Sequence, residues 1–202
     1  MTPAPVLEGN HVQLEPLSMN HLDALCAVGL EPELWRWTPN QVRDRDEMRA
    51  YVEAALEDER RGLSQPFATV LKQSGQVVGS TRYLNMDMKN RRVEIGATWV
   101  GKPWQRTPVN TEAKYLMLRH AFEILDCVRV ELKTDALNEC SRRAVLRLGA
   151  KKEGTLRRHV LTYTGRMRDT VYFSILNGEW PSVKARLQEK LNSKLLPAGA
   201  TA

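Results

Sequence analysis

The segment from Arg92 to Thr134 limits the possible folds more than any other part of the chain. Alternating apolar residues predict a strand over residues 92–100 and another over 128–134. Between them, Thr107 and Pro108 form a typical helix start, with Thr as the capping residue and Pro at the first helical position. A strand, a helix and a second strand in this order predict two parallel strands joined by a right-handed crossover.

The rest of the chain adds strands and helices that enlarge this unit into a sheet. Apolar or alternating runs between turn residues predict strands at 11–17, 67–72, 77–84, 155–162 and 167–176. Capping residues and helical periodicity predict helices after Ser18, from Asp44 to Arg61, at 138–148 and at 182–195, whereas 31–40 is predicted to be a loop. We therefore expect an α/β (α+β) fold. Its central sheet should be mixed, mostly antiparallel and of about seven strands, with helices on both faces.

Chain length and composition favour one folded domain. The 202 residues, of which 42% are hydrophobic and 27% charged, are typical of a single globular domain that needs no disulfides. We expect this domain to span residues 10–195. The segments 1–9 and 196–202 contain Pro, Gly or small residues and are expected to be loose ends.

Several features favour a cytoplasmic protein without a metal site. No apolar run reaches the roughly 18 residues that span a bilayer, and Met1 to Pro5 does not resemble a signal peptide. Cys26, Cys127 and Cys140 are an odd number and include no C-x-x-C pair, which argues against a disulfide framework and against zinc. The four histidines lack metal-ligand spacing. We therefore expect reduced thiols and no metal.

The charge is concentrated in one segment. The net charge is +6, and the stretch from Arg142 to Arg168 holds nine Lys or Arg residues with Glu153 as its one acid. Such a segment is either a solvated charged face or the binding surface of an anion, for example a phosphate-bearing cofactor. No nucleic-acid-binding motif accompanies it, so nucleic acid is not an expected partner.

The loop that precedes the crossover helix carries the clearest sign of ligand binding. It reads WVGKPWQRTPVNTE from Trp99 to Glu112. The first turn of a helix presents unpaired backbone N–H groups and the positive end of the helix dipole, which together bind phosphate. Because the loop holds only Gly101, it lacks a glycine-rich phosphate fingerprint. By physical chemistry alone it is a candidate anion site, and most loops of this kind bind nothing.

From about residue 8 to 186 the chain resembles the GNAT acyl-CoA N-acetyltransferases. It is most similar to their RimJ/RimL-type branch, which includes the ribosomal-protein N-terminal acetyltransferases. The resemblance rests on the stretches HVQLEPLSMNHLDAL, VVGSTRYL, VEIGATWV, TEAKYLMLRHAFE, ELKTDALNECSRRAVLRLGAKKEGTLRRH and RDTVYFSILNGEWPSVK. It implies the GNAT fold, in which acetyl-CoA binds in a cleft where the fourth and fifth strands diverge.

The resemblance places the family's phosphate-binding motif, [RQ]-x-x-G-x-[GA], on residues 105–110. Gln105 matches the first position, but Pro108 and Asn110 replace small residues, and Pro108 also removes an N–H donor. The resemblance implies that acetyl-CoA is bound by Trp99, Val100, Gly101, Gln105, Arg106, Thr107, Val109, Asn110 and Thr111. The backbone N–H groups of residues 99–101 are expected to hold the acetyl carbonyl.

Asn138 and Ser141 share one face at the start of a predicted helix. From the spacing alone, Asn138 is an ordinary helix cap. The resemblance implies in addition that Asn138 hydrogen-bonds the pantetheine arm and that Ser141 protonates the leaving thiolate. It also implies that Arg143, with its basic neighbours Arg142 and Arg147, lies near the CoA phosphates.

Glu94 is a carboxylate in the middle of a predicted strand. Alternation puts Val93 and Ile95 on the other face, so one interpretation is an outward-facing residue. The resemblance implies a general base, because the glutamate of V-E-I-G in this family lies near the acetyl group. Such a base accepts the proton of the amine directly or through water.

The resemblance assigns acceptor binding to Trp35, Trp37 and Asp169. The two tryptophans belong to a loop that alternatively forms a lid packed on its own core. Asp169 alternatively pairs with Arg157 or Arg158 in a structural role.

The chain is thus interpreted as an enzyme that transfers the acetyl group of acetyl-CoA to a primary amine, with a protein N-terminus or a small molecule as the acceptor. The two substrates are expected to react directly in a ternary complex. The changes at Pro108 and Asn110 motivate an alternative, a CoA-binding sensor without turnover. A homodimer through Trp180 and the last helix is a further expectation.

Overall fold

The computed structural model describes residues 5–193. The segment 196–202 and residues 1–4, both expected to be loose, lie outside these residues. The expectation fails for Leu7–Glu8, which form strand β1 against strand β2 (Val12–Pro16). Leu7 is buried in the main core cluster, and this burial accounts for the order of the segment.

The described strands form one eight-stranded sheet in the order β1-β2-β3-β4-β5-β6-β8-β7. Its other members are β3 (Ser64–Leu71), β4 (Val77–Asp87), β5 (Arg92–Val100), β6 (Arg129–Asp135), β7 (Lys151–Leu161) and β8 (Met167–Leu176). The pair β5–β6 is parallel and the neighbouring pairs are antiparallel. The mixed, mostly antiparallel sheet is confirmed, and β1 is the strand added to the expected seven.

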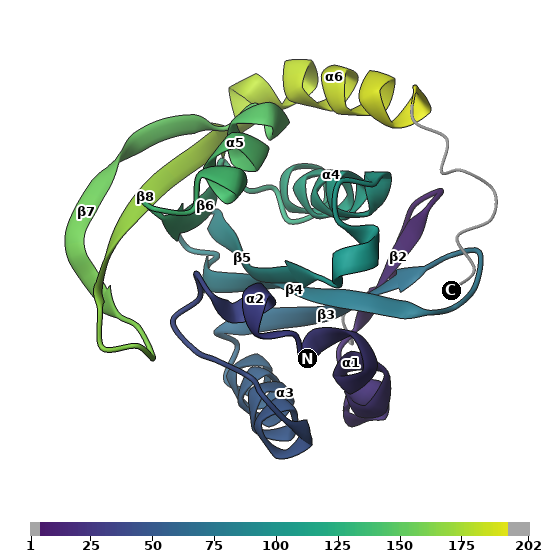
Figure 1. The fold of residues 1–202 in the computed structure, drawn as a ribbon. Helices are drawn as coiled ribbons and strands as arrows, with labels where there is room; N and C mark the ends of the chain where they lie inside the picture. Colours follow the sequence, from purple (N-terminus) through teal and green to yellow (C-terminus); the bar gives the residue numbers. More distant parts are fainter. Residues whose placement is uncertain (1–4, 194–202) are drawn as a thin grey trace.

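Helices cover both faces of the sheet, as expected (Figure 1). Helices α1 and α3 lie on one face, and α4, α5 and α6 lie on the other. The helices are α1 (Leu22–Gly29), α2 (Pro32–Trp35), α3 (Arg45–Arg60), α4 (Pro108–Glu123), α5 (Glu139–Leu148) and α6 (Trp180–Asn192), with 3₁₀ turns at Met19–His21, Lys102–Trp104 and Asn177–Glu179. The one-turn helix α2 lies within the segment predicted to be a loop.

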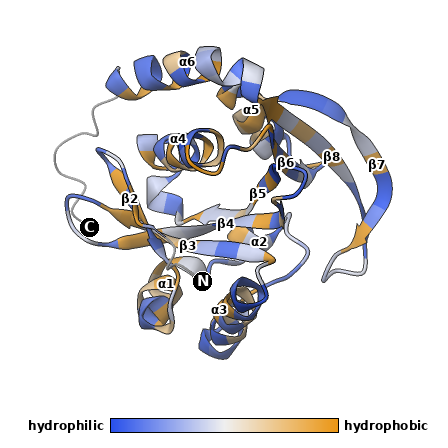
Figure 2. Ribbon diagram, turned by 180° about the vertical axis from the view of Figure 1, so that it is seen from behind, coloured by the Kyte–Doolittle hydropathy of each residue, from blue (hydrophilic) through white to orange (hydrophobic). Residues whose placement is uncertain are grey.

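The core consists of two clusters, one on each face of the sheet. The larger cluster lies between the sheet and α4, and the smaller one lies between the sheet and α1 and α3. Figure 2 shows the complementary pattern outside, with hydrophilic residues on the outer sides of α3 and α6 and along much of β7. Burial of these apolar faces is the main stabilising contribution to the fold.

Helix α4 lies between the sheet and helix α6 and is therefore buried along most of its length. Its start follows the prediction: Thr107 is the N-cap, its side chain accepts a hydrogen bond from the Val109 N–H at 3.3 Å, and Pro108 is the first helical residue. The cap and the proline fix where the helix begins, and thus where its free N–H groups lie.

Glu112 ties the first turns of α4 to the N-terminal strands. Its carboxylate, 3% exposed, accepts hydrogen bonds from the backbone N–H groups of Asn10, His11 and Val12 at 2.9, 2.6 and 2.7 Å. The neighbouring Gly9 has no room for a side chain, since a Cβ there would lie 2.5 Å from the Glu112 Cδ. Strand β2 is thereby held at one position along the helix.

Strands β5 and β6 pair only at their beginnings. The parallel register runs through three residue pairs and ends at Glu94 and Glu131, although β5 continues to Val100. Within the unpaired part, β5 contains a bulge: Arg82 of β4 is opposite Gly96 and Ser80 is opposite Trp99. This divergence of the two strands was expected from the resemblance and is confirmed.

Candidate active site

The N-terminus of α4 opens on a small pocket of about 40 Å³. Its lining comes from α4, α5 and α6, namely Asn110, Thr111, Ala144, Arg147, Leu148, Leu187 and Lys190. The Asn110 Oδ1 atom is buried without a hydrogen-bond partner, and the Asn110 N–H donates to no residue described by the structure. The unpaired N–H, close to Arg147, fits an anionic ligand, whereas Oδ1 as placed can accept a hydrogen bond from a donor group of a ligand.

The loop before α4 is held by its own hydrogen bonds. Gln105 donates from its side-chain Nε2 to the Val100 carbonyl at 3.0 Å, and Thr107 donates from Oγ1 to the Trp104 carbonyl at 2.7 Å. Arg106 lies in the left-handed region, with φ of 64°, and its side chain is exposed. The loop is therefore held in shape without the glycine of the family motif.

The backbone N–H groups expected at residues 99–101 differ in availability. The Gly101 N–H donates to the Val78 carbonyl at 2.8 Å and therefore already has a partner within the sheet. Successive amides along a strand point to opposite edges, so the Val100 N–H points away from β4, toward the gap left by β6. The expectation is corrected for Gly101, whereas Val100 has the required direction.

A buried lysine lies beneath the bulge on the side of α4. Lys114 is 6% exposed, and its amine hydrogen-bonds the hydroxyls of Thr81, at 3.2 Å, and Thr98. No carboxylate of the described residues pairs with it. Because burial disfavours the charged form, the pKa of Lys114 is lowered to about 7. The α4 helix is thus connected to the bulged part of β5 by an amine that titrates near neutral pH.

Helix α5 contributes to the pocket at the α4 N-terminus, and the predicted residues Asn138 and Ser141 lie at the start of this helix. The Asn138 side-chain oxygen accepts the Ser141 N–H at 3.0 Å, so Asn138 caps the helix. The Asn138 Nδ2 and the Ser141 hydroxyl make no hydrogen bond to the described residues and remain available for a ligand. Arg147 lines the pocket, whereas Arg143 is 71% exposed and pairs with Glu139 at 3.1 Å.

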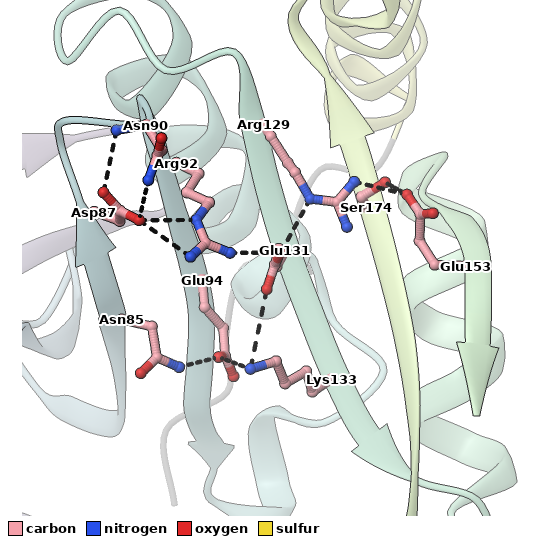
Figure 3. A network of polar contacts seen from close by, with 10 residues as sticks. All are labelled: Asn85, Asp87, Asn90, Arg92, Glu94, Arg129, Glu131, Lys133, Glu153 and Ser174. Carbon is pink, nitrogen blue, oxygen red and sulfur yellow. Dashed lines mark hydrogen bonds and ion pairs between the residues drawn. The ribbon is translucent and has the colours of Figure 1, made fainter. Parts of the chain in front are cut away.

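Glu94 is buried and paired, so the outward-facing interpretation is wrong. Its Oε2 atom accepts from Asn85 Nδ2 at 2.6 Å and contacts Lys133 Nζ at 2.6 Å (Figure 3). Burial by itself lowers the pKa of Lys133, but the hydrogen bonds and charges of Glu94 and Tyr172 together outweigh burial and raise that pKa. The raised pKa keeps Lys133 charged next to Glu94, and the Glu94 Oε1 has no hydrogen bond to a described residue.

The same sheet face carries a chain of alternating charges (Figure 3). It crosses the strands from Asp87 to Arg92, Glu131, Arg129 and Glu153, with contacts of 3.1, 3.8, 3.0 and 2.7 Å. Because most of these charges are satisfied by their neighbours, this surface is polar without a large excess of either sign. Glu94 and Lys133 form the end of the network that lies nearest to the strand divergence.

Of the two tryptophans expected at the acceptor site, only Trp37 is accessible. Trp35 is 2% exposed, packs against Tyr51 and Trp99, and donates from its indole to the Gly29 carbonyl at 2.7 Å, so it packs the core. Trp37 is half-buried, with Arg36 over its ring at 4.9 Å and Arg166 at 6.0 Å.

The turn between β7 and β8 closes against the loop that follows α2. The Tyr163 N–H donates to the Pro39 carbonyl at 2.8 Å. Asp169, on β8, accepts the Arg158 N–H at 2.7 Å, where Arg158 has φ of 49°. This contact stabilises the irregular part of β7, and it involves the backbone of Arg158 where the sequence suggested its side chain.

Sequence reasoning missed Lys114, Lys133, Asn85 and Arg82. Lys114 was discoverable, since it lies four residues before Leu118 and eight before Phe122, on an apolar face of the crossover helix. The partners of Glu94 carried no such signal, because they come from two other strands.

The described residues contain no group of three metal-ligating side chains. None of the helices described is long and apolar enough to cross a membrane.

Trp180 was expected at a dimer contact, and this expectation is wrong. It is 6% exposed, stacks on Phe122 and donates to Glu123 at 2.8 Å within the same chain. The residue anchors helix α6 on helix α4, so it cannot also serve as an exposed contact.

Comparisons with known proteins agree with this geometry. Residues 11–151 match the family model described as an acetyltransferase (GNAT) domain. YdaF of Bacillus subtilis, provisionally named a ribosomal N-acetyltransferase, is 32% identical over 136 residues, which are 66% of this chain and 73% of YdaF.

Two solved structures extend the match to the whole fold. A GCN5-related N-acetyltransferase from Brucella melitensis is 33% identical with a TM-score of 0.87, covering 95% of this chain and 87% of that one. Mycobacterium smegmatis RimJ, solved in complex with CoA-disulfide, is 26% identical with a TM-score of 0.77, covering 92% and 91%. The chain belongs to the GNAT family of N-acetyltransferases, in its RimJ/RimL-like branch.

Proposed function

We propose that this enzyme transfers the acetyl group of acetyl-CoA to the primary amine of a protein N-terminus or of a small molecule. The observation that carries the proposal is the divergence of β5 and β6 directly after Glu94. It brings an unpaired strand edge next to a free helix N-terminus and a buried carboxylate. The name of YdaF supports a protein acceptor, and the CoA-disulfide complex of RimJ supports the cofactor.

The residues around the α4 N-terminus fit the phosphates of CoA. The Asn110 N–H, the positive end of the helix and Arg147 offer positive potential and donors in one place. A half-turn of the Asn110 side-chain amide puts its NH₂ group where Oδ1 has no partner, and it then donates to a phosphate oxygen. On α5, the free Asn138 Nδ2 is suited to an amide of the pantetheine arm.

When bound, acetyl-CoA supplies the acetyl group as an activated thioester. The Val100 N–H donates to the acetyl oxygen and stabilises the negative charge that develops on it. The Glu94 Oε1 accepts the proton released by the attacking amine, directly or through water. As the new C–N bond forms and the C–S bond breaks, the Ser141 hydroxyl gives its proton to the CoA sulfur and regains one from solvent.

The pairing of Glu94 fits this role as proton acceptor. Because Lys133 and Asn85 both bind Oε2, the carboxylate is held in one orientation with Oε1 unused. The ion pair also places a positive charge next to the carboxylate that is proposed to receive the proton.

Two measurements test the proposal. Calorimetric titration with acetyl-CoA, with NAD as the control ligand, should show saturable and selective binding. Release of CoA thiol should then be followed with a panel of amines and ribosomal-protein N-terminal peptides. Asn138→Ala and Ser141→Ala should each reduce turnover. Selective binding without turnover for any acceptor would favour the CoA-binding sensor, and no binding at millimolar acetyl-CoA would overturn both.

A further inference from the structure

Arg82, in the middle of β4, is a buried guanidinium without a carboxylate partner. It is 6% exposed, and its Nε atom is buried without any hydrogen bond. Its Nη2 donates to the Tyr51 carbonyl at 3.3 Å, and the guanidinium lies 4.2 Å from the centre of the Tyr51 ring. No carboxylate in the part of the chain described by the structure forms an ion pair with it.

An unpaired buried arginine is physically unusual. A buried charge normally has a partner, since removing it from water is costly. A lysine avoids this cost by losing its proton, as the lowered pKa of Lys114 illustrates. An arginine does not deprotonate in proteins. Arg92 and Arg129, on the same sheet face, are both ion-paired. The described part of the chain thus supplies no anion to neutralise Arg82, which leaves this role open to a ligand.

Arg82 lies on the same face of the sheet as Glu94, close to the bulge. It is directly opposite Gly96 on β5, and Glu94 is two residues before Gly96 on that face. Gly96 has no Cβ, and one placed there would lie 3.1 Å from the Glu94 Oε1 and 2.9 Å from the Leu84 Cδ1. The free oxygen of Glu94 thus lies over Gly96, the residue that is opposite Arg82.

Tyr51 connects Arg82 to the bulge itself. Its ring covers the guanidinium, and its hydroxyl donates to the carbonyl of Ala97 at 3.5 Å. Ala97 is the bulge residue, with φ of 46°. Arg82 and Glu94 are therefore a cation and a carboxylate on either side of Gly96, next to the backbone proposed to hold the acetyl group.

We propose that Arg82 binds a carboxylate of the acceptor, so that the acceptor is an amine with a carboxylate nearby in the same molecule. Two sources offer this chemistry: a free amino acid through its α-carboxylate, or a peptide whose first residue is Asp or Glu. The inference rests on the proposed function, because it takes Glu94 as the group that receives the amine proton. The Nε–H has no hydrogen-bond partner and Nη2 has a second N–H besides the one given to the Tyr51 carbonyl, so the guanidinium keeps donors for a carboxylate.

The first experiment needs no variant. CoA thiol release by the wild-type enzyme should be compared for acceptors that differ only in the carboxylate: an amino acid and its carboxamide, and peptides that begin with Asp or Asn, or with Glu or Gln. A charge-assisted hydrogen bond predicts kcat/KM roughly 10- to 100-fold higher for the carboxylate member of the pair that fits. The pair of acceptors whose kcat/KM values differ identifies where the recognised carboxylate comes from. Equal rates within every pair would overturn the proposal, whereas no rate with any amine would instead count against the proposed function.

The variants then assign the preference to one residue. Arg82→Met should lower kcat/KM for the carboxylate acceptor to the level of its uncharged partner and leave the uncharged acceptor nearly unchanged. Arg82→Lys should keep part of the preference, and it replaces Arg82→Met if that variant does not fold, as judged by circular dichroism. Arg92→Met, a paired arginine on the same face, is the control and should keep the full preference. An equal loss on both acceptors in Arg82→Met and Arg82→Lys would reduce Arg82 to a structural role.

Discussion

The Glu94 Oε2 atom lies 2.6 Å from the Lys133 Nζ, and this ion pair bridges β5 and β6 at the point where the strands stop pairing. Glu94 belongs to the last paired level, and Lys133 is two residues beyond its partner Glu131. The ion pair therefore lies at the base of the gap proposed to hold the acetyl group. It orients a carboxylate whose other oxygen is free.

Replacing Glu94 by Gln should remove the proposed base. We expect kcat to fall by about 100-fold or more, because general-base catalysis typically contributes that much. Acetyl-CoA affinity should change little, since Glu94 is not among the residues that line the pocket at the α4 N-terminus. Thiol-release kinetics and calorimetry measure the two effects. Glu131→Gln, on the neighbouring strand, is the control, and an unchanged kcat in Glu94→Gln would exclude the role.

Lys114 should make stability depend on pH. Its pKa is about 7 in the folded chain, against an ordinary value of 10.5. Below pH 7 the amine is protonated in both states, and between about 7 and 10.5 only the unfolded chain keeps the proton. The free energy of unfolding should therefore rise with pH across this window, on the order of 5 kcal/mol in total. Above it both states are neutral and the gain is complete.

The variant Lys114→Met isolates this contribution, because it keeps the apolar stem and removes the titrating group. Urea unfolding of both proteins from pH 6 to 10 should show a difference in unfolding free energy that shifts in favour of the wild type as the pH rises. A difference that is independent of pH would show that Lys114 keeps its ordinary pKa.

Glu112→Gln should destabilise the fold. The carboxylate accepts three backbone hydrogen bonds from residues 10–12, and an amide offers one oxygen acceptor and places an NH₂ group against N–H donors. We expect a loss of about 2 kcal/mol in the free energy of unfolding, measured with urea. Glu53→Gln on the exposed side of α3 is the control and should lie within roughly 0.5 kcal/mol of the wild type.

Arg147 should matter for CoA more than Arg143, although the resemblance implied that both lie near the CoA phosphates. Arg147 lines the pocket at the α4 N-terminus, whereas Arg143 is exposed and paired with Glu139. Arg147→Ala should weaken acetyl-CoA binding about tenfold, which corresponds to about 1.4 kcal/mol, and should reduce the salt dependence of binding. Calorimetry at two salt concentrations distinguishes the variants. A larger loss in Arg143→Ala would reverse the assignment.

Much of the fold could be predicted from the sequence because its signals are local. The start of α4 depends on Thr107 and Pro108, which lie within one turn of each other. The cap of α5 at Asn138 and its end at Gly149, with φ of 104°, are equally local. Alternation likewise located β5 at the expected residues. The short elements α2 and β1 were not predicted, since their formation depends on packing against residues far away in the sequence.

The candidate site was predictable in outline and not in its contacts. The sequence indicated Glu94, but its partners Asn85 and Lys133 are fixed by the register of β4 and β6 against β5. The same holds for Trp180, whose burial on α4 depends on where the last helix returns.

Local patterns of capping and periodicity were enough to predict the order of strands and helices, and the family resemblance predicted the kind of chemistry. Only long-range packing fixed which amides are free, which carboxylate is paired, and that Arg82 is a buried cation without a carboxylate partner. The two differ in how far apart along the sequence the interacting residues lie. Capping and periodicity act between residues a few positions apart, whereas ion pairs and burial join residues tens of positions apart, which only the packed sheet brings into contact.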